Sequence, residues 1–454
     1  MKLNRVISTI QQIFIWSHGD GLRARLLRGG AGSIGVKVAN TLLAFLLAVV
    51  LARSLGPKGY GVYAFAFALL TLLAIPAQAG LPQLVVRETA KAHALEDWSL
   101  MQGIWRWSTR FIFMFSLVLV FFVGSILWFG EAWINSDRRS TLLAGLLLVP
   151  LIALCLARGS ALRGLGRVVR GQVPGNVVRP GLLILLLLMV AWIFPENVVT
   201  PQNVMLLHVL ASLIALVFVT VMLKNEQPNA LCKVKYPREE RVYWRRAALP
   251  LALVAGLQLI NSQADIVLLG LIREDAEVGV YRVVVQMGNL VIFGLVAINQ
   301  ALHPHFAALY SSGELIKLQR LVTISARAIL ALALIPVGLF LFAGQPILGL
   351  IFGAEYIIGA MALAILAMGQ LSNAAFGSVG ALLNMTGHER DTMRGMMIAI
   401  VLNIVLNLTL IPRFGMAGAA TATAVSFFVW NAILWFYVRR RLGIESSGFA
   451  WRRV

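Results

Sequence analysis

The chain has 454 residues, of which 59% are hydrophobic and only 13% are charged, and its formal net charge is +20. This composition excludes a soluble globular protein, because repeated apolar runs of about 18–25 residues match the thickness of the hydrocarbon core of a bilayer. It also argues against nucleic acid as a partner, since the basic residues are dispersed over many short segments; anionic membrane lipids are the simpler partner. The two cysteines indicate neither a disulfide framework nor a metal site, so no cofactor is expected.

The first 29 residues are predicted to form a cytoplasmic interfacial segment. Val6, Ile10, Ile13 and Phe14 share one face of a helix, and five basic residues lie near them in the sequence. An amphipathic basic helix of this kind is typical of a segment that lies on the membrane surface. The first long apolar run follows Gly30 and is expected to act as an uncleaved membrane anchor.

The apolar runs predict an all-α polytopic membrane protein with twelve transmembrane helices. None of the runs shows the strict alternation and the length of about 10 residues that strands of a membrane β-barrel require. The predicted spans are, in order, residues 31–52, 60–79, 111–133, 141–156, 177–194, 203–223, 247–272, 278–302, 328–350, 357–383, 396–411 and 416–437.

The distribution of Lys and Arg predicts the topology. Of these 39 residues, 30 precede the first span, follow the last span or follow an even-numbered span, six lie in the opposite connections, and three lie inside spans. Short basic loops remain cytoplasmic by the positive-inside rule, so both termini are predicted to be cytoplasmic. The longest basic segment, 224–246, is predicted to be a cytoplasmic linker between an N-terminal six-helix lobe (30–223) and a C-terminal six-helix lobe (247–438), and 439–454 to be a basic cytoplasmic tail.

Two short matches between the halves indicate an internal repeat. Gly61-Val62-Tyr63 opens the second predicted span and Gly279-Val280-Tyr281 opens the eighth, at an offset of 218 residues. Gly166 and Gly387 precede the fifth and eleventh spans, at an offset of 221 residues. Because each unit has an even number of helices, the two copies insert in the same orientation and form a parallel repeat, which places a binding site near the bilayer midplane between the lobes.

The connection between the first two spans carries a motif that resembles a known family. The segment 51–63 reads Leu-Ala-Arg-Ser-Leu-Gly-Pro-Lys-Gly-Tyr-Gly-Val-Tyr, and it is similar to the turn between helices 1 and 2 of Wzx-type flippases, the polysaccharide transporter branch of the MOP superfamily. Ala79-Gly80-Leu81-Pro82 and Thr386-Gly387-His388 fit the same pattern. We interpret the turn motif as structural, because Gly56, Gly59 and Gly61 with Pro57 favour a tight connection.

The resemblance implies a MATE-like (MOP) fold and a flippase in the bacterial inner membrane. Such a protein moves undecaprenyl-pyrophosphate-linked oligosaccharide from the cytoplasmic to the periplasmic leaflet for the synthesis of surface polysaccharide, and is a transporter, not an enzyme. Its expected partners are this lipid-linked glycan, membrane lipids and, as further candidates, other membrane proteins of polysaccharide assembly. The alternatives are a multidrug or cation antiporter of the same superfamily and, with less support, a polytopic O-antigen polymerase or ligase.

Three basic residues inside the spans are candidates for substrate binding: Lys37, Arg179 and Arg282. An intramembrane charge is costly unless it faces protein or water, which makes such residues functional candidates. Lys37 and Arg179 are both expected near the cytoplasmic side, where they could bind a pyrophosphate or an acidic sugar. The alternative is that both side chains extend towards the interface and have no such role.

Asp265 is the only carboxylate deep in a predicted span, and Asn261 and Gln263 lie close to it in the sequence. Arg282 on the next span is expected at a similar, outer depth, so that a static salt bridge between Asp265 and Arg282 is one interpretation. The other interpretation is a coupling or gate site, in which Asp265 takes up a proton or binds Na⁺ with the oxygens of Asn261 and Gln263.

Overall fold

A computed structural model describes residues 22–130, 135–193 and 199–448, and the described part is helical without strands. The α-helices are α2 (Leu22–Gln78), α3 (Leu81–Ala94), α4 (Trp98–Phe129), α5 (Ser136–Gly145), α6 (Leu148–Gly164), α7 (Val168–Val173), α8 (Arg179–Ile193), α9 (Pro201–Glu226), α10 (Arg241–Ile272), α11 (Asp275–Val291), α12 (Phe293–Ser311), α13 (Leu315–Ile351), α14 (Ala360–Phe376), α15 (Val379–Met385) and α16 (Glu389–Leu442). The short helices are η1 (Pro174–Val178), η2 (Asn229–Lys233) and η3 (Ala354–Gly359).

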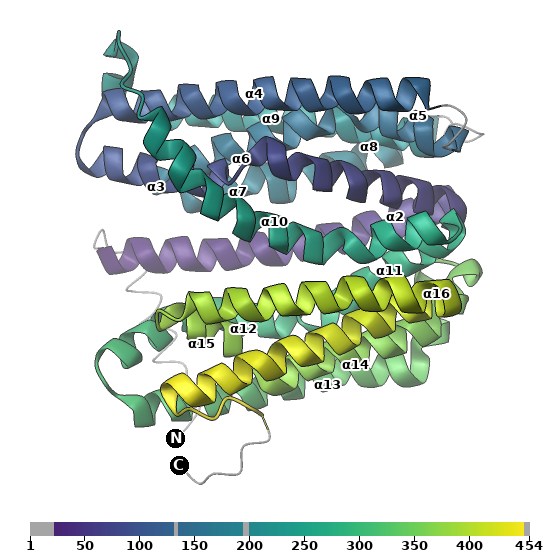
Figure 1. Cartoon of the computed structure of the whole chain (residues 1–454). Coiled ribbons are helices and arrows are strands. Elements are labelled where there is room, and N and C mark those ends of the chain that lie inside the picture. Colours follow the sequence, from purple (N-terminus) through teal and green to yellow (C-terminus); the bar gives the residue numbers. More distant parts are fainter. Residues whose placement is uncertain (1–21, 131–134, 194–198, 449–454) are drawn as a thin grey trace.

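The twelve predicted spans appear as fewer, longer helices. In the described part of the chain, nine helices are long and apolar enough to cross a membrane, or ten if the bent pair α11–α12 counts as one span. Two of these, α2 and α16, are interrupted by a glycine with positive φ, Gly56 (φ 63°) and Gly415 (φ 53°). In Figure 1 the chain turns back at the right-hand end of both helices, so each contains two of the predicted spans. The difference in number therefore has a physical reason: a single glycine in the left-handed region reverses the chain without a loop.

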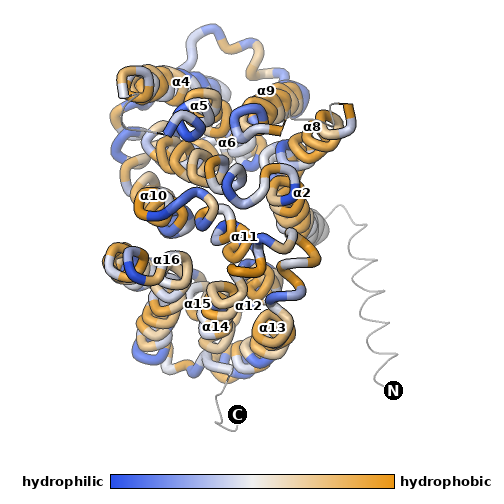
Figure 2. Tube along the Cα trace, turned by 90° about the vertical axis from the view of Figure 1, so that its right-hand side faces the viewer, coloured by the Kyte–Doolittle hydropathy of each residue, from blue (hydrophilic) through white to orange (hydrophobic). Residues whose placement is uncertain are grey.

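The helices form two lobes that meet along α2, α10 and α11 (Figures 1 and 2). In chain order, we assign α2 to α9 to the N-terminal lobe and α10 to α16 to the C-terminal lobe, with α2, α10 and α11 at the junction. The largest apolar core draws buried residues from both lobes, among them Tyr63, Val204, Tyr281 and Leu363. Of two smaller cores, one combines the N-terminal lobe with the first turns of α10, and the other lies in the C-terminal lobe. The main core is therefore shared between the lobes.

The segment that we predict to be a linker packs against the N-terminal lobe. The Arg238 amide donates to the Ser99 carbonyl oxygen at 3.2 Å. Trp244, near the start of α10, is fully buried, with its ring centroid 5.3 Å from that of Trp107. The linker and the first turns of α10 are therefore held by the N-terminal lobe, although α10 continues towards the C-terminal lobe.

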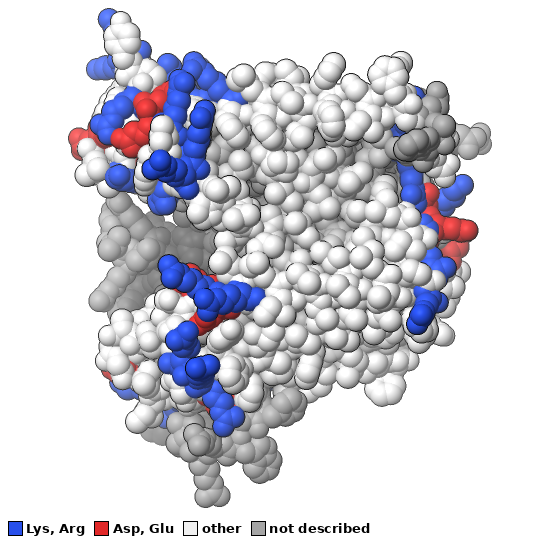
Figure 3. Space-filling view, viewed as in Figure 1, with Lys and Arg blue, Asp and Glu red and all other residues white. Residues whose placement is uncertain are grey.

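Charged side chains lie at the two ends of the bundle and leave an uncharged band between them (Figure 3). We call the left-hand end in Figure 3 the basic end; it contains the connections that the positive-inside rule assigns to the cytoplasm. The right-hand end, which contains Gly56 and Gly415, is called the opposite end. The predicted interfacial segment lies outside the described residues up to position 21, and α2 already begins at Leu22.

The repeated Gly-Val-Tyr tripeptides pack against each other near the opposite end. A Cβ atom on Gly61 would overlap the Asp275 carbonyl group of α11, and a Cβ atom on Gly279 would overlap the Pro57 carbonyl group of α2. Each glycine thus allows the backbones of α2 and α11 to approach closely, as small residues do in membrane helix packing. From the motif we had interpreted Gly61 as part of the turn. Its role in the structure is instead to let α2 and α11 pack closely.

We expect Gly61→Ala to lower stability by about 1–3 kcal/mol, because the added methyl group forces two backbones apart. The measurement is thermal unfolding of the purified protein followed by tryptophan fluorescence. Gly338→Ala on α13 is the matched control, since no atom lies within 4 Å of a Cβ atom built there. Equal unfolding temperatures for the two variants would contradict the close contact of the repeats.

Three side chains, Arg53, Arg138 and Tyr356, form contacts between the lobes that close the opposite end. Arg53 donates to the carbonyl oxygens of Ile351 (2.8 Å) and Leu350 (2.5 Å) at the C-terminus of α13, where a cation is favourable. The Tyr356 hydroxyl donates to the Ala52 carbonyl oxygen at 3.1 Å. The remaining contact joins the two lobes through Arg138 and Asp275. Arg53 belongs to the turn motif, so this motif also contributes to closure.

Arg138 on α5 forms an ion pair with Asp275 at the start of α11, with Nε 2.8 Å from Oδ1. Its guanidinium group also donates to the Gly270 carbonyl oxygen at 2.8 Å and lies over the Phe65 ring. The two charged side chains are only 18% and 7% exposed, so solvent screens this pair less than a surface pair. The ion pair is therefore expected to stabilise the closed arrangement of the opposite end.

We expect Arg138→Gln to favour opening of this end by a factor of about 10 to 100, the effect of losing a hydrogen bond to a charged group. The measurement is the labelling rate of Val278→Cys, a buried position on α11, by a water-soluble maleimide after Cys155 and Cys232 are replaced. Arg413→Gln removes an exposed cation at the same end and is the control. A labelling rate that both variants leave unchanged would mean that the ion pair does not hold the lobes together.

Candidate functional site

Two cavities lie on either side of α11 in the middle of the bundle. Arg282 and Gln286, four residues apart, line a cavity towards the N-terminal lobe. Val285 and Asn289 line a second cavity, inside the C-terminal lobe. Residues four apart share one face of a helix, whereas neighbouring residues project about 100° apart. α11 is thus a common wall of both cavities.

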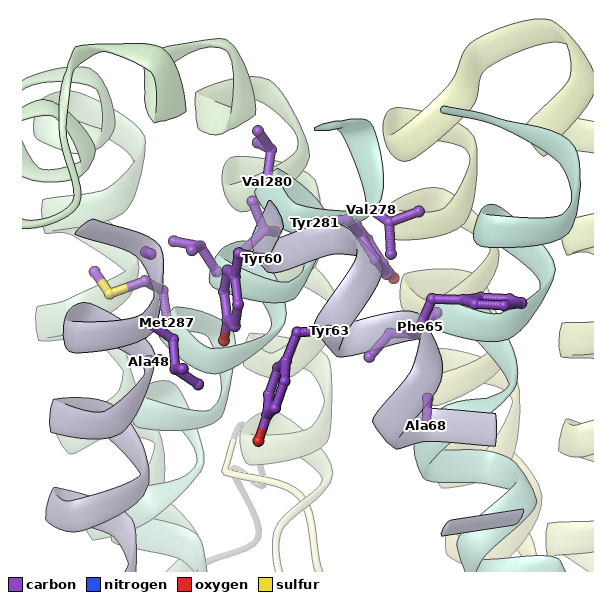
Figure 4. Close-up of a cluster of buried hydrophobic side chains, with 14 of the residues drawn as sticks. Ala48, Tyr60, Tyr63, Phe65, Ala68, Val278, Val280, Tyr281 and Met287 are labelled. Atoms are coloured by element: carbon purple, nitrogen blue, oxygen red, sulfur yellow. The ribbon is translucent and has the colours of Figure 1, made fainter. Parts of the chain in front are cut away.

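The cavity towards the N-terminal lobe, which we call the cationic cavity, has a volume of about 150 Å³ and is lined by two arginines, Arg179 of α8 and Arg282 of α11. Tyr60, Tyr63 and His208 complete its polar wall. Figure 4 shows Tyr60 and Tyr63 extending in the same direction from α2. The two positive charges come from different lobes, so an anion bound here would contact both.

A buried hydrogen bond organises the wall of the cationic cavity. The Tyr63 hydroxyl and His208 Nδ1 are 2.8 Å apart, and each residue is 4% exposed. The His208 ring also stacks on Phe67, with ring centroids 5.0 Å apart. His208 lies on α9, so this contact holds α9 and α2 together beside Arg179. A polar group buried at this depth needs such a partner.

An irregular stretch of helix places Arg179 in the cavity. The π-helix η1 (Pro174–Val178) lies between α7 and α8 and ends directly before Arg179. Single π-turns are frequent at functional sites because they rotate the following residues out of α-helical register. Gly175 and Pro180, on either side of this position, also line the cavity.

Lys37 does not belong to the described lining of the cationic cavity. It is exposed on α2, on the basic-end side. The predicted pair of Lys37 and Arg179 is therefore replaced by a pair of Arg179 and Arg282. Helix depth alone had suggested the first pair, because it does not say which way a side chain projects.

The second cavity, which we call the amide-lined cavity, has a volume of about 400 Å³, and Asp265 lies on its wall. Asp265 Oδ1 accepts a hydrogen bond from Asn407 Nδ2 at 2.8 Å, and Oδ2 accepts from the Tyr281 hydroxyl at 3.2 Å and from the Thr423 hydroxyl. Asn407 in turn donates to Asn403 Oδ1 at 3.0 Å. The carboxylate thus joins α10, α11 and both halves of α16.

The first of the two interpretations of Asp265, a static salt bridge to Arg282, does not agree with the structure. Within the described part of the chain no ion pair joins them, and Arg282 faces the cationic cavity instead. Tyr281, its neighbour in the sequence, is the residue of α11 that contacts Asp265. The physical reason is the turn of about 100° per residue, which sends adjacent side chains to opposite walls.

The two amides predicted to assist Asp265 have different positions. Asn261 lines the amide-lined cavity with Asp265. Gln263 is absent from the described lining of that cavity, and its Oε1 atom is buried without a hydrogen-bond partner. Spacing explains this difference, because residues four apart share a helix face and residues two apart do not.

Several residues of these sites were not predicted from the sequence. Asn403 and Asn407 are four residues apart within one apolar span, a spacing that would have identified a polar helix face. His208 is a single histidine within a span, which is also unusual in a membrane helix. No local pattern distinguishes Thr423 or Tyr281, since only the packing of α16 and α11 around α10 brings them to Asp265.

Residues 26–310 match the family described as polysaccharide biosynthesis protein, which is more than half of the chain. The chain belongs to this family. This membership agrees with the resemblance noted from the turn motif. Together with the membrane-length helices of the described residues, it makes the chain a multi-pass membrane protein.

Two curated relatives have names that concern glycans. A probable low-salt glycan biosynthesis flippase (Agl15) from Haloferax volcanii is 29% identical over 175 residues, which are 38% of this chain and 36% of the relative. A capsular polysaccharide biosynthesis protein (CapF) from Staphylococcus aureus is 26% identical over 196 residues, which are 43% of this chain and 49% of the relative. The alignments therefore span half or less of these relatives.

Solved structures confirm the predicted MATE-like (MOP) fold. An inward-facing multidrug resistance MATE transporter of the MOP superfamily superimposes with a TM-score of 0.70 at 14% identity, covering 89% of this chain and 94% of that chain. The lipid II flippase MurJ in an inward closed conformation gives a TM-score of 0.70 at 14% identity, covering 89% and 87%. At this identity the likeness concerns the fold alone.

Proposed function

We propose that the protein is a flippase for an oligosaccharide linked to a lipid pyrophosphate. The observation that carries the proposal is the cationic cavity, in which Arg179 and Arg282 face one space from opposite lobes. A pyrophosphate has several negative charges, and each arginine offers it a planar pair of donors. Because the arginines belong to different lobes, an anion can contact both only when the lobes are close together. The affinity for the anion therefore depends on the relative position of the lobes.

Asp265 is the proposed coupling site, for H⁺ or Na⁺. A carboxylate that accepts three hydrogen bonds inside an apolar span can hold a cation or take up a proton. The residues fit a hard cation, because Asn407 Oδ1 is buried without a hydrogen-bond partner beside the carboxylate and the Thr423 hydroxyl. Tyr281 and Arg282 are adjacent on α11, so a change at Asp265 would be transmitted to the cationic cavity through one helix.

The closed opposite end supports an alternating-access cycle. With the basic end assigned to the cytoplasm, the contacts of Arg53, Arg138 and Tyr356 would close the periplasmic side. Substrate would then enter from the cytoplasmic leaflet, and release would require these contacts to break. In this proposal both termini lie in the cytoplasm, and the protein resides in the inner membrane.

The test is transport of a fluorescent undecaprenyl-pyrophosphate-linked oligosaccharide across liposomes that contain the purified protein. Movement to the other leaflet is expected only with protein present, and inorganic pyrophosphate should compete. In parallel, strains that lack their own flippase and make different lipid-linked oligosaccharides are tested for rescue of surface polysaccharide. Absence of both transport and rescue would refute the proposed activity.

A multidrug antiporter with the same fold is the alternative function. The two arginines disfavour the organic cations that such a protein would export, because the cavity that faces both lobes already carries positive charge. Efflux of a cationic dye from cells, unaffected by pyrophosphate, would favour this alternative. A polymerase or ligase has no support from the fold, since the solved structures that share it are transporters.

A further inference from the structure

The amide-lined cavity contains more polar groups than Asp265 uses. Asn261, Asn289, Asn299, Gln370, Asn373 and Asn431 all line it. Its volume of about 400 Å³ is within the range of about 300–1,000 Å³ typical of small-ligand pockets. Such a concentration of amides within the membrane-spanning part of a lobe is costly unless the groups meet polar partners. The cavity is therefore suited to a polar occupant beyond the coupling cation.

Two of the lining side chains have buried polar atoms without a partner. Gln370 on α14 is 3% exposed, and its Oε1 atom accepts no hydrogen bond in the structure. The Trp430 Nε1 atom is also buried without an acceptor. Buried polar groups are nearly always paired, so unpaired ones on a cavity wall indicate where a ligand would bind. One of these atoms is an acceptor and the other a donor, which together suit hydroxyl or amide groups.

The charge of the cavity selects between classes of ligand. Among the described residues of its lining, Asp265 is the only one that carries a charge, and that charge is negative. An acidic ligand would be repelled, whereas a neutral ligand rich in hydroxyl groups could pair with the amides. Trp430 and Phe427 add an apolar surface on the same wall. Ser262 and Asn289 on the wall are exposed, so the cavity is accessible from outside the lobe.

We infer that the amide-lined cavity binds an uncharged sugar unit of the transported glycan. This inference rests on the proposed flippase function. It adds a second contact between protein and substrate: the pyrophosphate lies in the cationic cavity, and a sugar of the same molecule lies in the amide-lined cavity on the other side of α11. The two cavities are separated by one helix, which has a diameter of about 10 Å with side chains. The cavity would thus favour glycans with neutral hexoses or N-acetylhexosamines over glycans with uronic acids at this position.

The test measures sugar binding and pyrophosphate binding separately. The purified full chain is placed in lipid nanodiscs without sugar-based detergent. Saturation-transfer NMR is then recorded with glucose, N-acetylglucosamine and glucuronate, and inorganic pyrophosphate is titrated by calorimetry. We expect magnetisation transfer from the protein to the two neutral sugars and a weaker saturation-transfer signal for glucuronate.

Substitutions assign the sugar signal to the cavity. Gln370→Leu should weaken binding of the neutral sugars about 5- to 150-fold, since an unmatched buried hydrogen bond costs about 1–3 kcal/mol. Gln83→Leu makes the same chemical change at an exposed position on α3 and should have no effect. Trp430→Phe keeps an aromatic ring but removes the Nε1 donor, and it should weaken sugar binding less than Gln370→Leu does. This variant replaces Gln370→Leu in the test if Gln370→Leu does not fold. Arg179→Gln should weaken pyrophosphate binding about 10- to 100-fold and leave sugar binding unchanged.

Each outcome decides the inference. No transfer to neutral sugars by folded protein that still binds pyrophosphate would overturn it and leave the flippase proposal standing. A stronger signal for glucuronate, or equal sugar binding by Gln370→Leu and the wild type, would also overturn it. Loss of pyrophosphate binding and transport in the wild type would instead refute the proposed function itself.

Discussion

Arg282→Gln is expected to abolish transport and to weaken pyrophosphate binding about 10- to 100-fold. Arg282 and Arg179 face the same cavity, so each would supply charge-assisted hydrogen bonds to a bound pyrophosphate. Such a bond is worth about 1.5–3 kcal/mol, and a change of 1.4 kcal/mol corresponds to a factor of ten in affinity. Calorimetry with inorganic pyrophosphate and transport in liposomes are the two measurements.

Two further variants make the Arg282 result specific. Arg320→Gln removes an exposed cation of α13 outside the cavity and should leave both measurements unchanged. Arg282→Lys keeps the charge but not the planar pair of donors, so it should restore only part of the affinity. If Arg282→Gln bound pyrophosphate as the wild type does, the cationic cavity would not be the substrate site.

Lys37→Gln should have a smaller effect that depends on ionic strength. Lys37 is exposed, and on the basic-end side it would act by attracting the anion, not by holding it. The initial rate of transport should fall at low salt and approach the wild-type rate at high salt, where exposed charges are screened. A loss of affinity as large as that of Arg282→Gln would contradict this assignment.

Asp265→Asn is expected to uncouple transport from ion gradients. The wild-type rate in liposomes should rise with an applied pH or sodium gradient, and the variant should have lost this response. Coupling free energies between sites are typically about 1–3 kcal/mol, so the loss of stimulation should be about 5- to 150-fold. The amide cannot carry a charge or release a proton, although it still reaches Asn407 and Thr423.

Asp137→Asn is the matched control for this experiment, because Asp137 is exposed at the start of α5 and far in sequence from the proposed site. It should respond to both gradients as the wild type does. Applying the pH and the sodium gradient one at a time identifies the coupling ion. A variant at Asp265 that still responds to the same gradient would show that coupling occurs elsewhere.

The sequence alone predicted the helical membrane fold and the family. Apolar runs must be as long as the bilayer is thick, and backbone groups inside lipid must pair within a helix, so length and hydropathy are sufficient evidence for the spans. The turn motif at 51–63 led to the family to which the chain belongs. The repeated tripeptides at Gly61 and Gly279 indicated a duplication, and they turned out to be the contact between the repeats.

The sequence also identified the charged residues of the candidate site but not their partners. Position along a helix gives the depth of a residue in the bilayer, and from depth Lys37 was paired with Arg179 and Asp265 with Arg282. The direction of a side chain depends on the rotation of its helix about the helix axis. The sequence does not determine this rotation, because nearly every face of these apolar helices is hydrophobic.

Only the tertiary structure decided which residues share a cavity. The close crossing of α2 and α11, which two glycines permit, turns Arg282 towards Arg179 and Tyr281 towards Asp265. The π-helix before Arg179 and the glycine breaks in α2 and α16 are backbone features that span prediction does not include. Depth is set by the bilayer and can be read from composition, whereas rotation is set by packing between helices that are distant in the sequence.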